Sequence, residues 1–232
     1  MEMEIMIAPS LMCMDFLQVG QQISIFNKHM DLLHFDMMDG HYCRNLALCP
    51  DILRQVKSIS QLPVDVHVML ENPENFLDAV LECGADYISL HTDCIAKSAF
   101  RTINRIKDAG CKVGIVLNPS TPLSAIMEYA QYIDMLTIMT VDIGFAGQKF
   151  IREMLRKIEQ AKELKKTHGY SFIVQVDGAV NHLSIPDLAS VGAECYIVGT
   201  SGLFSLDKDL ESACRMVRQQ IAEAARNAGH AK

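Results

Sequence analysis

Short apolar runs alternate with longer amphipathic segments along the whole chain. The apolar runs predict strands at 5–9, 32–37, 64–69, 87–91, 112–117, 135–139, 172–176 and 196–198. Segments with helical periodicity lie between them, at 15–28, 50–58, 73–83, 96–109, 123–131, 148–168, 184–191 and 207–225. Gly84, Gly110 and Gly192 each follow a predicted helix, which is where glycine commonly ends one.

The regular alternation of strands and helices indicates the fold class. Strands that are apolar almost throughout are typical of a parallel sheet covered by helices on its faces. Eight strand–helix pairs in 232 residues fit a closed (β/α)8 barrel better than an open sheet. We see no linker, low-complexity tract or second domain, so residues 1–232 are predicted to form one barrel domain. Residues 224–232 are predicted to be frayed or disordered.

Composition and charge exclude several classes of protein. Half of the residues are hydrophobic, and the net charge of −7 argues against a nucleic-acid partner. No apolar stretch is long enough to span a bilayer, and the N-terminus is acidic where a signal peptide would be basic. The chain is therefore predicted to be cytoplasmic. Its eight cysteines form no C-x-x-C pair, which favours free thiols over disulfides.

Polar side chains lie at the carboxyl ends of three predicted strands. His34 and Asp36 are two residues apart in an apolar run, so they point to the same face of the strand. His67 occupies a similar place in the next strand, and Asp177 ends the seventh. A lone histidine in a strand is usually a core or rim residue, but barrels bring their strand ends together at one mouth. Two imidazoles and two carboxylates suit zinc, manganese, iron or cobalt, and less specifically magnesium.

Other polar residues nearby compete for the same role. His41 and Asp39 follow the second strand, and His91 ends the fourth. His91 is predicted to be a rim residue.

Three glycine-containing loops follow the last three strands, at 140–148, 177–180 and 199–202. Glycine lets backbone N–H groups approach an anion, and late barrel loops often bind phosphate. One such loop would indicate only a turn, but three together predict a phosphate site.

Three of the 14 methionines, Met38, Met69 and Met139, fall at predicted strand ends. Core filling explains most methionines, but these three could equally form a water-excluding wall at the barrel mouth.

At these residues the chain resembles the ribulose-phosphate 3-epimerase family. The matching stretches are 7–11, 34–41, 65–69, 144–150, 176–178 and 198–201, in the order of the family and across almost the whole chain. Within the family, Met-Thr-Val-Asp at 139–142 and Gly-Phe-Ala-Gly at 144–147 look more like the D-allulose-6-phosphate 3-epimerase branch. Ribulose enzymes more often have Ser-Val-Asn-Pro followed by Gly-Phe-Gly-Gly.

The resemblance implies a TIM barrel of the ribulose-phosphate-binding type and an isomerase that acts on a ketose phosphate at carbon 3. The expected pair is D-allulose 6-phosphate and D-fructose 6-phosphate. The alternative is D-ribulose 5-phosphate and D-xylulose 5-phosphate, or less plausibly a non-catalytic sugar-phosphate-binding barrel. Relatives form homo-oligomers, so a dimer or hexamer is expected.

The resemblance also implies the roles of individual residues. His34, Asp36, His67 and Asp177 would hold one divalent metal ion, and Asp36 and Asp177 would be the two acid/base groups. The expected substrate-binding residues are Ser10, His67, Gly144, Phe145, Ala146, Gly147, Asp177, Gly178, Ala179, Gly199, Thr200 and Ser201. Met38, Met69 and Met139 match methionines that line the intermediate.

Two departures from the family concern the loops. The family usually has Phe-Val-Pro-Asn where this chain has Tyr-Cys-Arg-Asn at 42–45, and a proline where it has Ile143. Loss of both prolines is expected to loosen the loops after the second and sixth strands. Arg44 could reach the substrate or a partner subunit.

The chemistry of inversion accounts for two carboxyl groups. Inverting carbon 3 of a ketose phosphate removes a proton from one face, which gives a cis-enediolate, and returns a proton to the other face, so an acid/base group is needed on each side. A decarboxylase on the same barrel would carry Asp-x-Lys on the third strand, where this chain has Asp65-Val66-His67. A non-catalytic sugar-phosphate sensor would not need all four polar residues.

Overall fold

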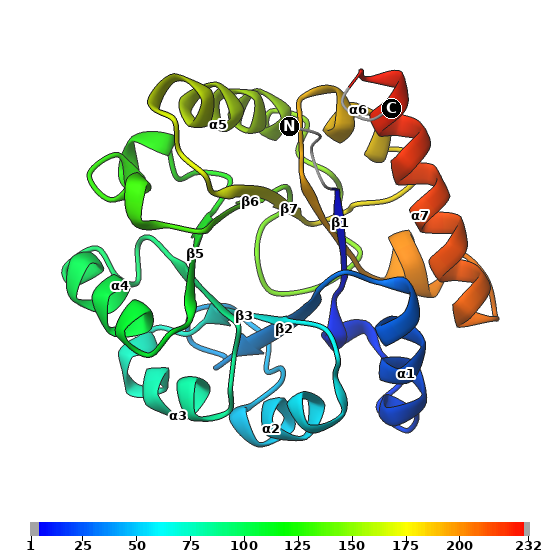
Figure 1. Cartoon of the computed structure of the whole chain (residues 1–232), viewed down its shortest axis with the longest axis horizontal. Helices are drawn as coiled ribbons and strands as arrows, with labels where there is room; N and C mark the ends of the chain where they lie inside the picture. The colour runs from blue at the N-terminus through cyan, green and yellow to red at the C-terminus, as the bar shows by residue number, and fades with distance from the viewer. Residues whose placement is uncertain (1–4, 230–232) are drawn as a thin grey trace.

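The computed structural model of the protein describes residues 5–229. Parallel strands form a barrel with helices around it (Figure 1). The hydrogen-bonded order is β1-β8-β7-β6-β5-β4-β3-β2, which is the predicted single (β/α)8 TIM barrel. The strands are β1 (Met6–Pro9), β2 (Leu33–Met38), β3 (Val64–Met69), β4 (Tyr87–His91), β5 (Lys112–Leu117), β6 (Met135–Met139), β7 (Ile173–Asp177) and β8 (Cys195–Val198).

The barrel closes between β1 and β2 through very few contacts. The backbone N–H of Asp31 donates to the carbonyl of Ile7 at 3.1 Å, and a carboxylate oxygen of Asp31 accepts from the N–H of Ile7 at 2.8 Å. One isolated parallel bridge then pairs Ser10 with His34. Closure therefore places Ser10, the residue after β1, beside His34 of β2.

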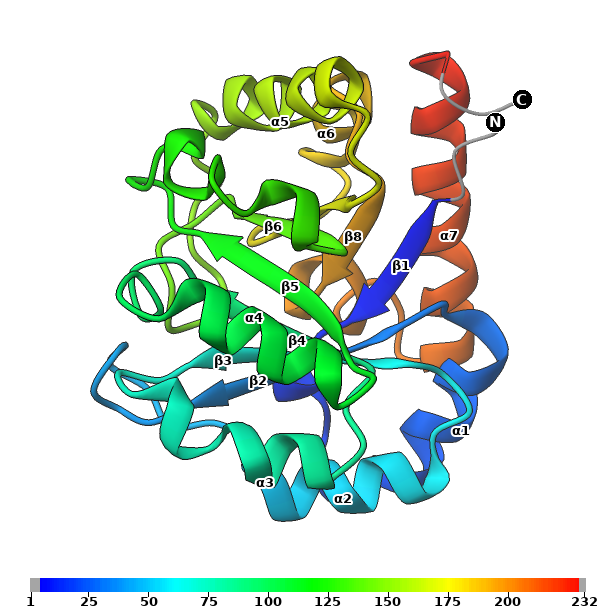
Figure 2. The ribbon, with the colours of Figure 1, turned by 60° about the vertical axis from the view of Figure 1, so that its left-hand side comes forward.

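The helices lie on the outside of the barrel (Figures 1 and 2). Strands β2 and β3 are buried along their whole length, because helices cover one face and the barrel interior the other. No helix among residues 5–229 is long and apolar enough to cross a membrane. The helices are α1 (Val19–His29), α2 (Pro50–Ile59), α3 (Leu77–Glu82), α4 (Ala99–Asp108), α5 (Met154–His168), α6 (Ile185–Ser190) and α7 (Leu210–Asn227).

Two predicted helices are shorter or tighter than expected. The segment 73–83 is a 3₁₀ turn at Pro73–Asn75 followed by α3, and the segment 123–131 is two 3₁₀ turns, Leu123–Ile126 and Ala130–Tyr132. Segments this short gain little from helix formation alone, so local packing decides their geometry. Ile126 and Ala130 are the residues that anchor the second segment in the core.

The ends of other helices also differ from the prediction, those of α5 and α7 among them. Helix α5 begins at Met154 rather than at Gln148, whose side-chain amide donates to the carbonyl of Phe145 at 3.1 Å within the preceding loop. Helix α7 continues to Asn227, and Ala225 is buried. The prediction that the chain is frayed or disordered from residue 224 is therefore wrong for residues 224–227. Residues 230–232 lie outside the described residues.

The interior of the barrel is layered. One apolar cluster inside it consists of Ala8, Leu32, Tyr87, Met135, Cys195 and Ile197. The next positions along the strands are polar and paired: Thr137 donates to Gln175 at 2.6 Å, and Ser89 donates to Asp65 at 2.6 Å. Gly114 leaves the space for Ser89, since a Cβ there would lie 1.9 Å from its hydroxyl oxygen. The polar residues at the mouth therefore lie next to buried polar side chains that are hydrogen-bonded to one another.

All eight cysteines are free, as the sequence predicts. Five of them are buried.

Candidate active site

Four polar side chains meet at the carboxyl ends of three strands. His34 and Asp36 come from β2, His67 from β3 and Asp177 from the end of β7. One ligand atom from each lies within 4.8 Å of the others. Nε2 of His34 is 3.2 Å from Nδ1 of His67, and Oδ1 of Asp36 lies 3.3 and 3.4 Å from these two nitrogens. Oδ2 of Asp177 is 3.8 and 3.6 Å from the same nitrogens.

These separations fit one divalent cation. Ligands about 2.1 Å from a tetrahedral ion lie about 3.4 Å from one another, which is close to the distances in this quartet. The donor set of two imidazoles and two carboxylates suits zinc, manganese, iron or cobalt, and magnesium less specifically. The quartet therefore forms a candidate metal site of the predicted composition.

The electrostatics at His34 favour positive charge at this place. Burial alone lowers the pKa of His34, but the carboxylates of Asp36 and Asp65 outweigh it and raise that pKa well above its usual range. The same carboxylates would attract a cation bound among these groups.

Each histidine of the quartet has a partner on its other ring nitrogen. Nδ1 of His34 is 2.9 Å from Oδ2 of Asp65, whose other carboxylate oxygen accepts from Ser89. Nε2 of His67 is 2.9 Å from Nε2 of His91. His91, the last residue of β4, is fully buried and not exposed at the rim. The pKa of His91 is lowered well below its usual value by burial, and then by the charge of His67.

The two carboxyl groups of the quartet have different surroundings. Asp36 is buried and accepts a 2.7 Å hydrogen bond from the hydroxyl of Ser10. Burial acts to raise the pKa of Asp36, but His34 and His67 outweigh it and hold that pKa well below the usual range. Burial raises the pKa of Asp177, and the charge of Asp36 adds to this effect against the opposing histidines. The two carboxyl groups therefore have pKa values displaced in opposite directions, with Asp177 the more readily protonated of the pair.

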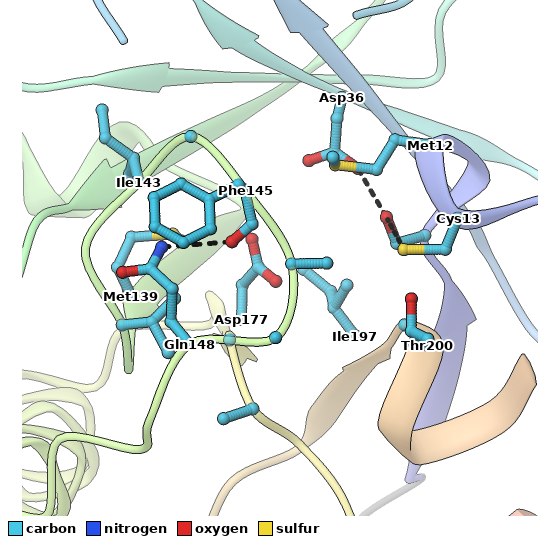
Figure 3. Close-up of a pocket in the computed structure, with 18 of the residues that line it drawn as sticks. Met12, Cys13, Asp36, Met139, Ile143, Phe145, Gln148, Asp177, Ile197 and Thr200 are labelled. Atoms are coloured by element: carbon cyan, nitrogen blue, oxygen red, sulfur yellow. Dashed lines mark hydrogen bonds between the residues drawn. The ribbon is translucent and has the colours of Figure 1, made fainter. Parts of the chain in front are cut away.

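A pocket opens above the quartet. In Figure 3, Asp36 and Asp177 both reach into it, between the loop that carries Ile143 and Phe145 and the segment that carries Cys13. His34 and His67 are fully buried and do not line it. The other predicted residues all do: Ser10, Asp36, Met38, Met69, Met139, Gly144, Phe145, Ala146, Gly147, Asp177, Gly178, Ala179, Gly199, Thr200 and Ser201.

The loops after β6 and β7 depend on glycine where they pack together. Gly178 has a φ of +112°, and a Cβ there would lie 2.5 Å from a methyl group of Val141. The next residue, Ala179, also has a positive φ, of +50°. Such geometry is uncommon for a non-glycine residue and turns the chain sharply back across the pocket.

Some amides at this edge have no acceptor in the protein. Within the hydrogen bonds of residues 5–229, the backbone N–H groups of Gly178, Gly199 and Thr200 donate to nothing. All three residues line the pocket. They are donors that an anion could accept from.

Contacts across the mouth join the loops that lack the family prolines. The side-chain amide of Asn45 donates to the carbonyl of Gly144 at 2.7 Å, which links the loop after β2 to the loop after β6. Tyr42 donates to the carboxylate of Asp93 at 2.9 Å, and Asn118 donates to Tyr42 at 2.8 Å.

The competing residues lie outside the quartet. Asp39 accepts from the backbone N–H groups of His41, Tyr42 and Glu71, so it holds the turn after β2. His41 is exposed, as is Arg44. Sequence reasoning overlooked Asp65 and Ser89, although alternation along β3 places Asp65 on the same face as His67.

The fold and the quartet together define a class: a barrel protein with a candidate metal site and two unlike carboxyl groups at the carboxyl ends of its strands. Solved structures share the barrel. A 3-hexulose-6-phosphate synthase from Salmonella typhimurium has a TM-score of 0.72 at 14% identity, covering 95% of this chain and 100% of that chain. KGPDC from Streptococcus mutans has a TM-score of 0.72 at 12% identity, covering 95% of this chain and 99% of that chain. At these identities the likeness shows the fold alone.

Sequence relatives are more specific. The model of the Ribulose-phosphate 3 epimerase family matches residues 6–204. The ribulose-phosphate 3-epimerase of Aquifex aeolicus is 35% identical over 220 residues, covering 94% of this chain and 98% of its own. That of Helicobacter pylori is 37% identical over 218 residues, covering 93% and 99%. The chain belongs to the ribulose-phosphate 3-epimerase family, and its named relatives are carbohydrate epimerases, a kind of isomerase. The allulose-6-phosphate branch stays a prediction.

Proposed function

We propose that this chain is a metal-dependent 3-epimerase that interconverts D-ribulose 5-phosphate and D-xylulose 5-phosphate. The names of its relatives favour this pair of substrates. The observation that carries the reaction type is the pair of unlike carboxyl groups: Asp36 and Asp177 share one pocket, and their pKa values are displaced in opposite directions. Such a pair suits proton removal on one face of a carbon atom and proton delivery on the other.

The proton balance follows from the two environments. Asp36 is held ionised, so it takes the proton from carbon 3 on its side of the sugar. Asp177 has a raised pKa and is the more readily protonated of the two, so in this scheme it starts protonated and gives a proton to the opposite face. Afterwards Asp36 is protonated and Asp177 ionised, which is the correct starting state for the reverse reaction. The hydroxyl of Ser10 keeps the Asp36 carboxylate oriented at 2.7 Å.

His34, Asp36, His67 and Asp177 would hold the divalent cation. The cation would supply positive charge against the negative charge that develops on the substrate oxygens when the proton leaves.

The remaining pocket residues would bind the sugar phosphate. The free amides of Gly178, Gly199 and Thr200 are suited to the phosphate group. The loop at 144–147 also lines the pocket. Met38, Met69 and Met139 line the wall near the carboxyl groups, where they would exclude water from the reacting carbon.

A second substrate pair is D-allulose 6-phosphate and D-fructose 6-phosphate. It is favoured by the sequence at 139–142 and by Ala146, which lines the pocket where ribulose enzymes more often have glycine. The same carboxyl groups would act on carbon 3 in either pair.

The deciding experiment compares kcat/KM for D-ribulose 5-phosphate and D-allulose 6-phosphate with the purified, metal-loaded protein. A higher value for the ribulose substrate supports the first pair, and a higher value for the allulose substrate supports the second. Solvent deuterium incorporated at carbon 3 is expected with the preferred substrate. No incorporation with either would contradict epimerisation, and carbon dioxide release from a keto-acid phosphate would favour a decarboxylase.

We also propose that the protein is cytoplasmic, acts as a homo-oligomer and works as one catalytic domain over residues 1–232. Light scattering of the purified protein distinguishes a dimer or hexamer from a monomer.

A further inference from the structure

His67 presents its two ring nitrogens to different neighbours. Its Nδ1 lies 3.2 Å from Nε2 of His34 and 3.4 Å from Oδ1 of Asp36, so this nitrogen belongs to the quartet. Its Nε2 lies 2.9 Å from Nε2 of His91. The ring centroids are 5.0 Å apart and the ring planes are 25° from parallel, so the two rings meet edge to edge through these nitrogens.

The contact between the two rings holds one proton. A neutral imidazole that offers the lone pair of Nδ1 to a cation carries its proton on Nε2. His67 is then the donor in the 2.9 Å contact, and Nε2 of His91 is the acceptor. His91 must therefore carry its own proton on Nδ1, so both tautomers follow from metal binding at His67.

Apart from His67, His91 has no hydrogen-bond partner among the described residues. The ring packs against Tyr42, with centroids 4.9 Å apart. Tyr42 is itself held by Asp93 and Asn118. Among the described residues, Nδ1 of His91 has no hydrogen-bond partner, and the whole side chain is buried. A hydrocarbon would pack there without an unsatisfied N–H, so the polar contact that accounts for an imidazole is the one with His67.

We propose that His91 is a positioning residue, which accepts the Nε2 proton of His67 and thereby fixes Nδ1 of His67 as a metal ligand. This inference rests on the metal site in the proposed function. It gives the two histidines of the quartet unlike supports, since Asp65 holds His34 with a carboxylate and His91 holds His67 with a neutral ring.

Metal affinity tests the proposal independently of turnover. Chelator-treated protein is titrated with Zn²⁺ against a chromophoric competitor, for the wild type, His91→Leu and His91→Gln. Leucine removes the acceptor, so we expect a loss of about 10- to 100-fold in affinity, whereas the amide oxygen of glutamine can accept and should keep the affinity within about threefold. The exposed His182 supplies the matched control, His182→Leu, which should bind like the wild type.

The outcomes separate this inference from the proposed function. Equal affinity in wild type and His91→Leu would overturn the role of His91 while the metal site stands. Equal loss in His91→Leu and His91→Gln would also overturn it, since the acceptor would not be what matters. Failure of the wild type to bind one Zn²⁺ per chain would instead contradict the metal site itself.

If His91→Leu fails to fold, nitrogen NMR of the wild type gives the same test. Histidine labelled with ¹⁵N should show, in the Zn²⁺-loaded protein, the proton of His67 on Nε2 and that of His91 on Nδ1. A proton on Nε2 of His91 would overturn the proposal.

Discussion

Asp36 and Asp177 carry the same chemical group in two different parts of the barrel mouth. Asp36 lies inside β2, next to the point where β1 closes the barrel, and its carboxylate receives the hydroxyl of Ser10. Asp177 ends β7, and the glycine loop begins immediately after it. The side chain of Asp36 is 5% exposed and that of Asp177 is 16% exposed.

The comparison shows that exposure alone does not set proton affinity. Asp177, the more exposed carboxyl group, has the raised pKa, because its burial and the charge of Asp36 outweigh the opposing effect of His34 and His67. Asp36 has a lowered pKa although it is buried more deeply, because His34 and His67 outweigh the burial. Two acid/base groups of unlike affinity therefore arise from placement within one cluster.

The largest expected effect comes from removing either carboxylate. We expect Asp36→Asn and Asp177→Asn each to lower kcat by about 10³-fold or more, because each face of carbon 3 would lose its acid/base group. Turnover assays with circular dichroism check the result. Near-normal epimerisation by either folded variant would contradict the two-base mechanism.

Removal of the metal ion should lower activity, because both carboxyl groups are among its proposed ligands. Chelation is expected to lower activity at least about 100-fold, because the charge that opposes the developing negative charge is lost. Adding back Zn²⁺, Mn²⁺, Co²⁺, Fe²⁺ or Mg²⁺ separately should restore activity and identify the effective ions. Full activity in protein shown by elemental analysis to be metal-free would count against the quartet.

Ser10→Ala sharpens the comparison on the Asp36 side. Loss of the 2.7 Å hydrogen bond removes a donor that favours the ionised form, so the pKa of Asp36 should rise. We expect kcat/KM to fall about tenfold and the acidic limb of its pH profile to move to higher pH. The exposed Ser24 provides a control in Ser24→Ala, which should leave the profile unchanged. An unshifted acidic limb in Ser10→Ala would show that this hydroxyl does not set the pKa.

The smallest expected effect is on the stability of metal-free protein, with opposite signs at the two sites. Asp177 has a raised pKa, so its ionisation costs stability once the pH exceeds its unfolded pKa, and metal-free Asp177→Asn should have a higher Tm than wild type near pH 7. Asp36 has a lowered pKa and stabilises the fold above its unfolded pKa, so metal-free Asp36→Asn should have a lower Tm than wild type.

Thermal melts of chelator-treated protein between pH 4 and 8 measure both differences. The Asp177→Asn difference should shrink towards pH 4, because the folded and unfolded carboxyl groups are then both protonated, whereas the Asp36→Asn difference should largely persist at pH 4, because the folded Asp36 stays ionised there. Shifts of the same sign in both variants near pH 7 would contradict the unlike environments.

The order of elements and the quartet could be predicted from the chain alone. Period-two alternation placed His34 and Asp36 on one face, and barrel topology placed His67 and Asp177 at the same end. These conclusions need only local periodicity and a common strand direction. Helix ends were less predictable: α5 begins at Met154, six residues after the predicted start at Gln148.

The partners of the quartet could not be predicted in the same way. Nothing in the sequence near His91 says that its ring meets His67 rather than solvent, because that depends on the register between β3 and β4. The links from Tyr42 to Asp93 and from Asn45 to Gly144 join residues 51 and 99 positions apart.

The sequence by itself determined the barrel, the ligand types and the family resemblance, since these follow from residue type, spacing and alternation. Only the tertiary structure decided which ring nitrogen faces the quartet and in which direction the pKa of each carboxyl group is displaced. Both depend on distances and burial among side chains from different strands, and such distances exist only once the barrel has closed.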